Sequence, residues 1–264
     1  MTKESKNKIN LDFKVTDELD RYNNYKAEPL VRFVLKHMDF LPYICDALTK
    51  FYSFDSINEL GRRNKNKFKV FVQTIDFEKE DNYKYINEFE ELLRQTYNIK
   101  SDYPSLENEM IQKKLSKVRG RILEKIIESF VQPRYLCTRS NPYMNKFSTG
   151  CMVLLNNKQL IINDRLTVDI AAWNGLRGEF YETKVGPHKF DESVLNLLSL
   201  IKNEMDNHNI TSVVGCVTMA NKDKLLENME EVKSKTNINF NNCIKVFGKH
   251  ELITLTENPF ELLA

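Results

Sequence analysis

The sequence lacks long hydrophobic runs, and its opposite charges nearly cancel. None of its apolar runs approaches the roughly 18 residues that a membrane-spanning helix requires. Residues 1–14 are polar and contain no apolar stretch of the kind found in signal peptides. We therefore predict a cytoplasmic protein without membrane contact. The formal net charge of +2 excludes a uniformly basic surface, so any binding to nucleic acid would depend on local basic patches.

Cysteines and glycine-rich motifs are also scarce. The chain has no phosphate-binding G-x-x-x-x-G-K-[ST] loop, no G-x-G-x-x-G and no G-x-S-x-G, which excludes the common nucleotide-binding loops and the serine nucleophile of α/β-hydrolases. The five cysteines are scattered and form no C-x-x-C pair, which argues against a zinc site and a disulfide framework. We interpret them as reduced and mostly buried thiols: Cys45, Cys137, Cys151, Cys216 and Cys243.

The first part of the chain has a helical pattern. Apolar side chains recur every three or four positions in residues 18–52 and 77–97, which predicts amphipathic helices. Pro29 and Pro42 are expected to mark helix starts or breaks. Residues 1–12 are polar, and we expect them to be frayed.

A polar stretch around Pro104 separates this part from the rest of the chain. We predict a mainly helical domain at 1–105 and a second domain at 106–264. The second domain begins with the clearest helix of the sequence, residues 109–131, which has one apolar stripe and is expected to end at Pro133.

Residues 54–75 combine a short helical pattern, a glycine turn and a second periodic segment. This order is typical of a helix-turn-helix, whose basic side chains contact DNA phosphates. The alternative is an ordinary solvent-exposed basic face. The candidate nucleic-acid-binding residues here are Arg62, Arg63, Lys65 and Lys67.

Two strand pairs are predicted in the second domain. The first flanks Asn156-Asn157 and is followed by a turn with Asp164. The second joins residues 168–173 to residues 180–185. Between these two strands lies Asn174-Gly175, the strongest short hairpin signal, and Gly178 is expected to absorb a second bend.

The rest of the chain alternates helix and strand. Asp191 is suited to cap the N-terminus of an apolar helix, and residues 210–219 read as a buried strand. Residues 225–232 predict a polar helix, and residues 244–255 predict a last strand with a short helical turn. This order indicates a mixed sheet with helices packed against it.

Three polar residues interrupt the otherwise apolar second hairpin. Glu182 and Lys184 are two positions apart and so share one face of a strand, while Asp169 lies on the partner strand, where a simple register brings it beside Glu182. Paired carboxylates repel each other and suit a hard divalent cation, and a nearby lysine can orient water or stabilise charge on a phosphate. The alternative is an exposed cross-strand salt bridge.

Val168-Asp169 followed by Glu182-Thr183-Lys184 resembles the signature of the PD-(D/E)xK nuclease superfamily, in which the residue before the aspartate is often proline. The resemblance covers roughly the part of the chain after the predicted boundary. It implies an α+β or α/β fold, with a restriction-endonuclease-like core of mixed central sheet and flanking helices after the helical N-terminal domain. It further implies a metal-dependent endonuclease that acts on double-stranded DNA, and sequence-specific restriction enzymes are one form of this activity.

By the same resemblance, Asp169, Glu182 and the carbonyl of Thr183 would bind Mg²⁺, for which Mn²⁺ substitutes, and Lys184 would act on the attacking water. Glu124, in the helix at 109–131, matches a glutamate of the family that leans into the active site. Glu128 is its rival, and an ordinary surface glutamate is the alternative for either residue.

Further candidate contacts to DNA are Lys117, Arg121, Arg139 and His188. One catalytic set cuts one strand, so double-strand cleavage would suggest a homodimer. The alternative function is a DNA-binding regulator or defence protein on a nuclease-like fold that does not cleave.

Overall fold

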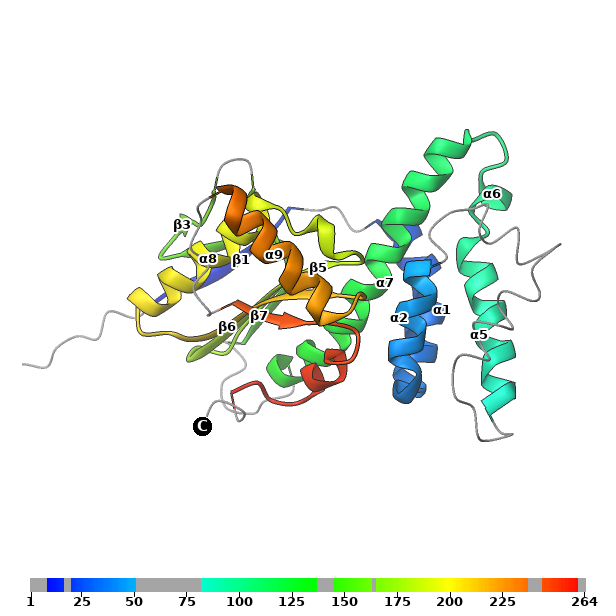
Figure 1. The fold of residues 1–264 in the computed structure, drawn as a ribbon. Coiled ribbons are helices and arrows are strands. Elements are labelled where there is room, and N and C mark those ends of the chain that lie inside the picture. The colour runs from blue at the N-terminus through cyan, green and yellow to red at the C-terminus, as the bar shows by residue number, and fades with distance from the viewer. Residues whose placement is uncertain are drawn as a thin grey trace, which may run out of the picture.

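The computed structural model describes residues 9–16, 20–50, 82–136, 145–162, 165–236 and 244–260. Within these residues, a seven-stranded mixed sheet has the order β1-β2-β4-β5-β6-β7, and β3 pairs with β2 (Figure 1). The predicted class, α+β with a mixed sheet flanked by helices, is confirmed. The strands are β1 (Leu11–Val15), β2 (Lys146–Leu155), β3 (Lys158–Gln159), β4 (Val168–Trp173), β5 (Arg177–Lys184), β6 (Thr211–Thr218) and β7 (Ile244–Phe247).

Helices cover both faces of this sheet. In Figure 1, α8 and α9 lie over one face, α7 packs against the other, and α1, α2 and α5 lie beyond α7. The described helices are α1 (Arg21–Lys36), α2 (Leu41–Lys50), α5 (Asn82–Tyr97), α6 (Ile99–Asp102), α7 (Asn108–Leu136), α8 (Glu192–Asn207) and α9 (Lys222–Thr236), with short 3₁₀ turns η1 (Met38–Phe40), η2 (Pro187–Lys189) and η3 (Leu252–Thr256). No helix in the described part combines the length and apolar character needed to cross a bilayer.

The sheet changes from antiparallel to parallel at β5. The neighbours β1, β2, β4 and β5 pair antiparallel, whereas β5, β6 and β7 are parallel. Parallel neighbours need a crossover connection, which α8 supplies between β5 and β6 and α9 between β6 and β7. The predicted alternation of helix and strand after the second hairpin is therefore confirmed. So is the cap of α8, where Asp191 accepts the Val194 amide at 3.0 Å.

The first hairpin has the turn that its asparagines predict. Asn156 and Asn157 both have positive φ, 51° and 64°, as a two-residue type I′ turn requires. The second hairpin differs, because only Gly175 has positive φ, at 91°. Asn174 instead accepts the amides of Leu176 and Arg177 through its side chain, at 3.0 and 2.8 Å.

Gly178 does not form the second bend predicted for it. It lies within β5, opposite Trp173. A Cβ at this position would come within 2.9 Å of the Phe180 ring. The glycine thus makes room for an aromatic side chain and does not turn the chain.

The N-terminal segment joins the sheet before the helices begin. Strand β1 pairs antiparallel with β2, with Leu11 opposite Leu155. Leu11 is only 1% exposed, and the rings of Phe13 and Phe180 meet edge to face at 6.3 Å. The predicted frayed start is therefore wrong for residues 11–12. A boundary at residue 105 does not separate the sheet from the N-terminal part, because β1 precedes it.

Two prolines lie inside helices instead of at their ends. Pro29 is within α1, and α7 continues past Pro133 to Leu136, contrary to the prediction that Pro133 ends it. The last turn of α7 is held by its contacts with the sheet. Arg134 pairs with the buried Glu179, and the Tyr135 hydroxyl donates to the same carboxylate at 2.9 Å. Pro42, in contrast, lies in the first turn of α2, as predicted.

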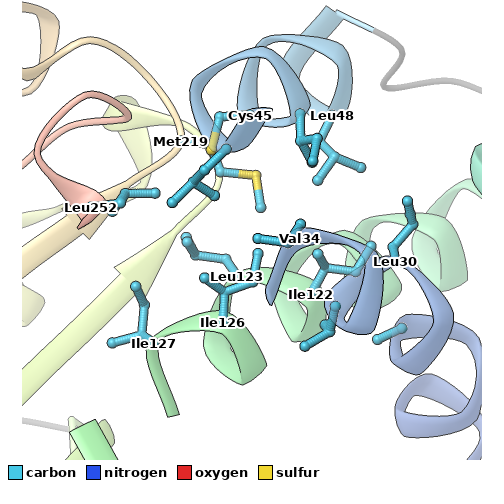
Figure 2. Close-up of a cluster of buried hydrophobic side chains, with 14 of the residues drawn as sticks. Leu30, Val34, Cys45, Leu48, Ile122, Leu123, Ile126, Ile127, Met219 and Leu252 are labelled. Carbon is cyan, nitrogen blue, oxygen red and sulfur yellow. The ribbon is translucent and has the colours of Figure 1, made fainter. Parts of the chain in front are cut away.

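The hydrophobic core is divided by the sheet into two clusters. One lies between the sheet and α8 with α9, and the other extends from the opposite face through α7 to α1, α2 and α5. Figure 2 shows the centre of the second cluster, where side chains of α1, α2 and α7 meet Met219 and Leu252. This cluster fixes α7 between the sheet and the N-terminal helices. The polar side of α7 is thereby held beside β2.

Candidate functional site

Strands β4 and β5 bring the predicted carboxylates together. Ile170 is paired with Tyr181, so the next step of the antiparallel register directs Asp169 toward Glu182. Asp169 Oδ2 accepts the backbone N–H of Thr183 at 2.7 Å and its hydroxyl at 3.0 Å. These two hydrogen bonds fix the aspartate against the strand that carries the glutamate.

Lys184 bridges the two carboxylates. Its Nζ lies 3.2 Å from Asp169 Oδ2 and also hydrogen-bonds Glu182 Oε1. Glu182 is 1% exposed, and Thr183 is 5% exposed. An exposed cross-strand salt bridge, the alternative considered from the sequence, does not describe a carboxylate buried to this degree.

Burial sets the electrostatics of this group. Burial, reinforced by the charge of Asp169, raises the pKa of Glu182 to about 7. Burial lowers the pKa of Lys184, but Asp169 and Glu182 more than offset this effect, so the pKa of Lys184 is raised. Burial and the charge of Asp169 thus both favour the protonated form of Glu182, whereas a bound cation would favour its charged form.

Arg165 is a member of the site that sequence reasoning missed. Its Nη2 forms an ion pair with Glu182 Oε1, the oxygen that also binds Lys184. The residue precedes β4 in an isolated bridge with Ile162, outside any periodic pattern. No sequence signal distinguished it from the other arginines.

Glu124 approaches the carboxylate pair from α7. Burial raises its pKa, and the charge of Asp169 raises it further, which indicates that the two side chains lie near each other. Arg121 Nη1 binds Glu124 at 2.9 Å, while its Nη2 lies 3.3 Å from Glu128. The pKa of Glu124 is thus linked to the charges of Asp169 and Lys184.

A cleft of about 700 Å³ adjoins Glu124. Its walls come from the N-terminal segment with α1, from the polar side of α7, and from β2, with Lys117 and Arg121 among the lining residues. The cleft could not be predicted from the sequence, because its walls are far apart along the chain. Other side chains that line it are Thr16, Asp20, Asn24, Glu128, Ser148 and Thr149.

Among the remaining predicted contacts, His188 lies in the described part of the chain. His188 is exposed on η2, on the side of α9, where its charge acts on Glu231. The other predicted contacts lie outside the described residues: Arg62, Arg63, Lys65, Lys67 and Arg139. The predicted turn residue Asp164 also lies outside them.

The side chains present are compatible with a divalent cation. No group of three or more His, Cys, Asp or Glu side chains converges as a ready metal site in the described part of the chain. Mg²⁺, however, is usually held by one or two carboxylates, with water and phosphate oxygens completing its shell. Asp169 and Glu182 meet this requirement. The pKa of Glu182 is raised mainly by burial and further by the charge of Asp169, and a bound cation would oppose both effects.

The raised pKa of Glu182 predicts how stability depends on pH without metal. Its pKa is about 7 in the folded state and lower when unfolded, so the folded state binds the extra proton and stability falls as pH rises toward 7. Between pH 5.5 and 8 in EDTA, we expect the unfolding free energy of the wild type to fall by about 2 kcal/mol relative to Glu182→Gln. Urea denaturation at both pH values measures this difference, and parallel pH profiles would contradict it.

Comparison with known proteins identifies no family. No family model matches the chain, and no curated protein does so. Among solved structures, the chain is similar to the crystal structure of protein VC1899 from Vibrio cholerae, with 14% sequence identity and a TM-score of 0.39. The alignment covers 93% of this chain and 57% of that chain. A TM-score this low carries no argument about fold or function.

Proposed function

We propose that this protein is a metal-dependent endonuclease that hydrolyses phosphodiester bonds of double-stranded DNA. The observation that carries the proposal is that Asp169, Glu182 and Lys184 come together on two neighbouring strands. The Lys184 ammonium forms ion pairs with both carboxylates. Burial of Glu182 supports a chemical role, since a desolvated carboxylate with a perturbed pKa is costly to maintain.

The arrangement around these residues also supports a PD-(D/E)xK-like core. An antiparallel hairpin, β4–β5, carries the three residues, and a helix and a parallel strand follow it. The preceding helix α7 packs against β4 and β5 and carries Glu124, whose pKa is raised by burial and by the charge of Asp169. This is the order that the resemblance implies for a restriction-endonuclease-like domain.

In this proposal, Asp169, Glu182 and the Thr183 carbonyl would hold Mg²⁺. When bound, the ion supplies a Lewis acid that lowers the pKa of water and neutralises phosphate charge. Lys184 positions the attacking water and stabilises negative charge on the phosphate through its ammonium group. Thr183 keeps Asp169 oriented through the two hydrogen bonds that the aspartate accepts.

The direct test is cleavage of mixed plasmid and phage DNA by the purified protein, with Mg²⁺, with Mn²⁺ and with EDTA. We expect cutting with either metal and none with EDTA. The fragment pattern would distinguish discrete sites from random cleavage. DNA binding without cutting under all three conditions would instead favour the alternative, a regulator or defence protein that binds DNA on this fold.

The two glutamates of α7 are expected to differ in their effect on cleavage. Glu124→Gln should reduce the rate about 10- to 100-fold, because it removes a charge that interacts with Asp169 and Lys184. Glu128→Gln should change the rate little, although it also loses an ion pair with Arg121. Initial rates at saturating Mg²⁺ measure both effects. A larger loss in the Glu128 variant would assign the helix carboxylate to Glu128.

A further inference from the structure

Arg165 is a cation at the site to which the proposed function assigns no task. Its guanidinium forms an ion pair with Glu182, and its charge also acts on Asp169 and Asp191. The Arg165 side chain is 26% exposed, compared with 1% for Glu182. The arginine thus reaches a buried carboxylate from the solvent side.

A second buried arginine–glutamate pair in this protein shows what a permanent contact looks like. Arg134 binds both oxygens of Glu179, with Nε at 3.2 Å and Nη2 at 2.7 Å. Its Nη1 donates to the carbonyl oxygens of Phe130 and Leu255, at 2.9 and 2.5 Å. All three nitrogens of this guanidinium are used.

Arg165 is bound far less completely. It contacts Glu182 through Nη2 alone, and its Nε is buried without a hydrogen-bond partner among the described residues. A buried donor left unpaired destabilises the folded state. The guanidinium therefore has donors available for another acceptor.

The charges of the site indicate when Arg165 would move. Asp169 and Glu182 are opposed by two cations, Lys184 and Arg165, so a bound divalent ion would add two positive charges to a balanced group. Lys184 contacts both carboxylates from within β5, whereas Arg165 contacts one of them from a segment outside the sheet. Repulsion by the ion would therefore displace Arg165 more easily than Lys184.

We propose that Arg165 is a displaceable counter-ion: it holds Glu182 until a divalent cation binds the carboxylate pair, and its guanidinium then binds a DNA phosphate beside the site. The planar fork of arginine suits phosphate oxygens, and the unpaired Nε supplies one of the donors. This inference rests on the proposed function, from which it takes the cation and the phosphate.

The affinity for Mn²⁺ distinguishes the proposed role of Arg165 from a purely structural one. Mn²⁺ is titrated calorimetrically into EDTA-treated, desalted protein. Arg165→Gln should bind Mn²⁺ about tenfold more tightly than the wild type, because the competing charge is gone. Arg165→Lys should stay close to the wild type, as should the control Arg177→Gln, an exposed arginine at the far end of β5 that lies over the Phe260 ring. Unchanged or weaker Mn²⁺ binding by folded Arg165→Gln would overturn the proposal.

Phosphate binding is tested with Ca²⁺, under conditions that allow DNA binding without rapid cleavage. Fluorescence anisotropy with a labelled duplex should show about tenfold weaker binding for Arg165→Gln, with a smaller difference in EDTA. If Arg165→Gln and the wild type bind the duplex with equal affinity in Ca²⁺ as well as in EDTA, the phosphate contact proposed for Arg165 is contradicted.

A measurement on the wild type covers the case in which Arg165→Gln does not fold. The Nε–H signal of Arg165 in ¹⁵N-arginine-labelled protein, assigned by its loss in Arg165→Lys, should shift on addition of Mg²⁺, and an unmoved signal would overturn the proposal. Failure of the proposed function is separable. If the wild type binds Mn²⁺ but cuts no DNA, the proposed nuclease function is refuted, and the proposed counter-ion role of Arg165 is not. If the wild type cuts DNA but Arg165→Gln binds Mn²⁺ with unchanged affinity, only the counter-ion role of Arg165 is refuted.

Discussion

Lys184→Ala is expected to reduce DNA cleavage about a hundred- to a thousandfold at saturating Mg²⁺. The ammonium of Lys184 contacts both Asp169 and Glu182, and no other side chain among the described residues forms an ion pair with both. Its loss removes the group that would position water and stabilise charge on the phosphate. The fold should persist, since the side chain is 24% exposed and Arg165 still neutralises Glu182.

Initial rates on supercoiled plasmid, thermal melting and DNA binding in Ca²⁺ together measure this effect. Lys233→Ala is a matched control, because Lys233 forms a surface ion pair with Glu230 on α9, away from the site. A Lys184→Ala protein that melts like the wild type and cleaves at the wild-type rate would refute the assignment of the site.

Asp169→Asn is the companion variant, and it is preferable to alanine. Asp169 accepts the N–H and the hydroxyl of Thr183, so alanine would leave these donors unpaired and could act through the fold. Asparagine keeps an acceptor oxygen and removes only the charge. We expect cleavage to be lost while the melting temperature stays near that of the wild type.

The parts of this structure that were predictable from sequence are local in the chain. Asp169, Glu182 and Lys184 are joined by one hairpin, so their alternation and the turn between the strands are enough to bring them together. The turn at Asn156 and Asn157 was predictable for the same reason, because positive φ is a property of those residues themselves.

The features that sequence reasoning missed depend on contacts between distant segments. The cleft forms only where α1, α7 and β2 come together. Arg165 belongs to the site only because it forms an ion pair with Glu182. Pro133 would end an isolated helix, but its neighbours Arg134 and Tyr135 bind Glu179 on β5 and hold the last turn of α7. Tertiary contacts here override a local rule.

Strand β1 is a different case, because its signal was present in the sequence. Leu11, Phe13 and Val15 alternate with Asp12 and Lys14, the pattern of a strand with one buried face. The segment is only five residues long and lies among polar residues, and its partner β2 is far along the chain. Its pairing therefore could not be inferred from its neighbours.

Arg134→Ala is expected to lower the free energy of unfolding by about 3–5 kcal/mol, because it leaves Glu179 as a buried carboxylate without its cation. Glu179 is 1% exposed and binds Arg134 through both oxygens. The hydroxyls of Tyr135 and Tyr181 also donate to it, at 2.9 and 2.7 Å. Burial, with the charge of Glu179, raises the pKa of both tyrosines, so they remain protonated donors but cannot replace the positive charge.

Urea denaturation of the two single variants and of the pair separates the buried charge from the contact itself. Arg134→Ala combined with Glu179→Gln should recover part of the loss, since no unpaired charge is then buried. Arg32→Ala is the control, because Arg32 is 77% exposed in its pair with Glu28, and such pairs contribute about 0–1 kcal/mol. A loss in Arg134→Ala no larger than in this control would mean that the network of Glu179 does not hold α7 to the sheet. The position of Glu124 beside Asp169 would then require another explanation.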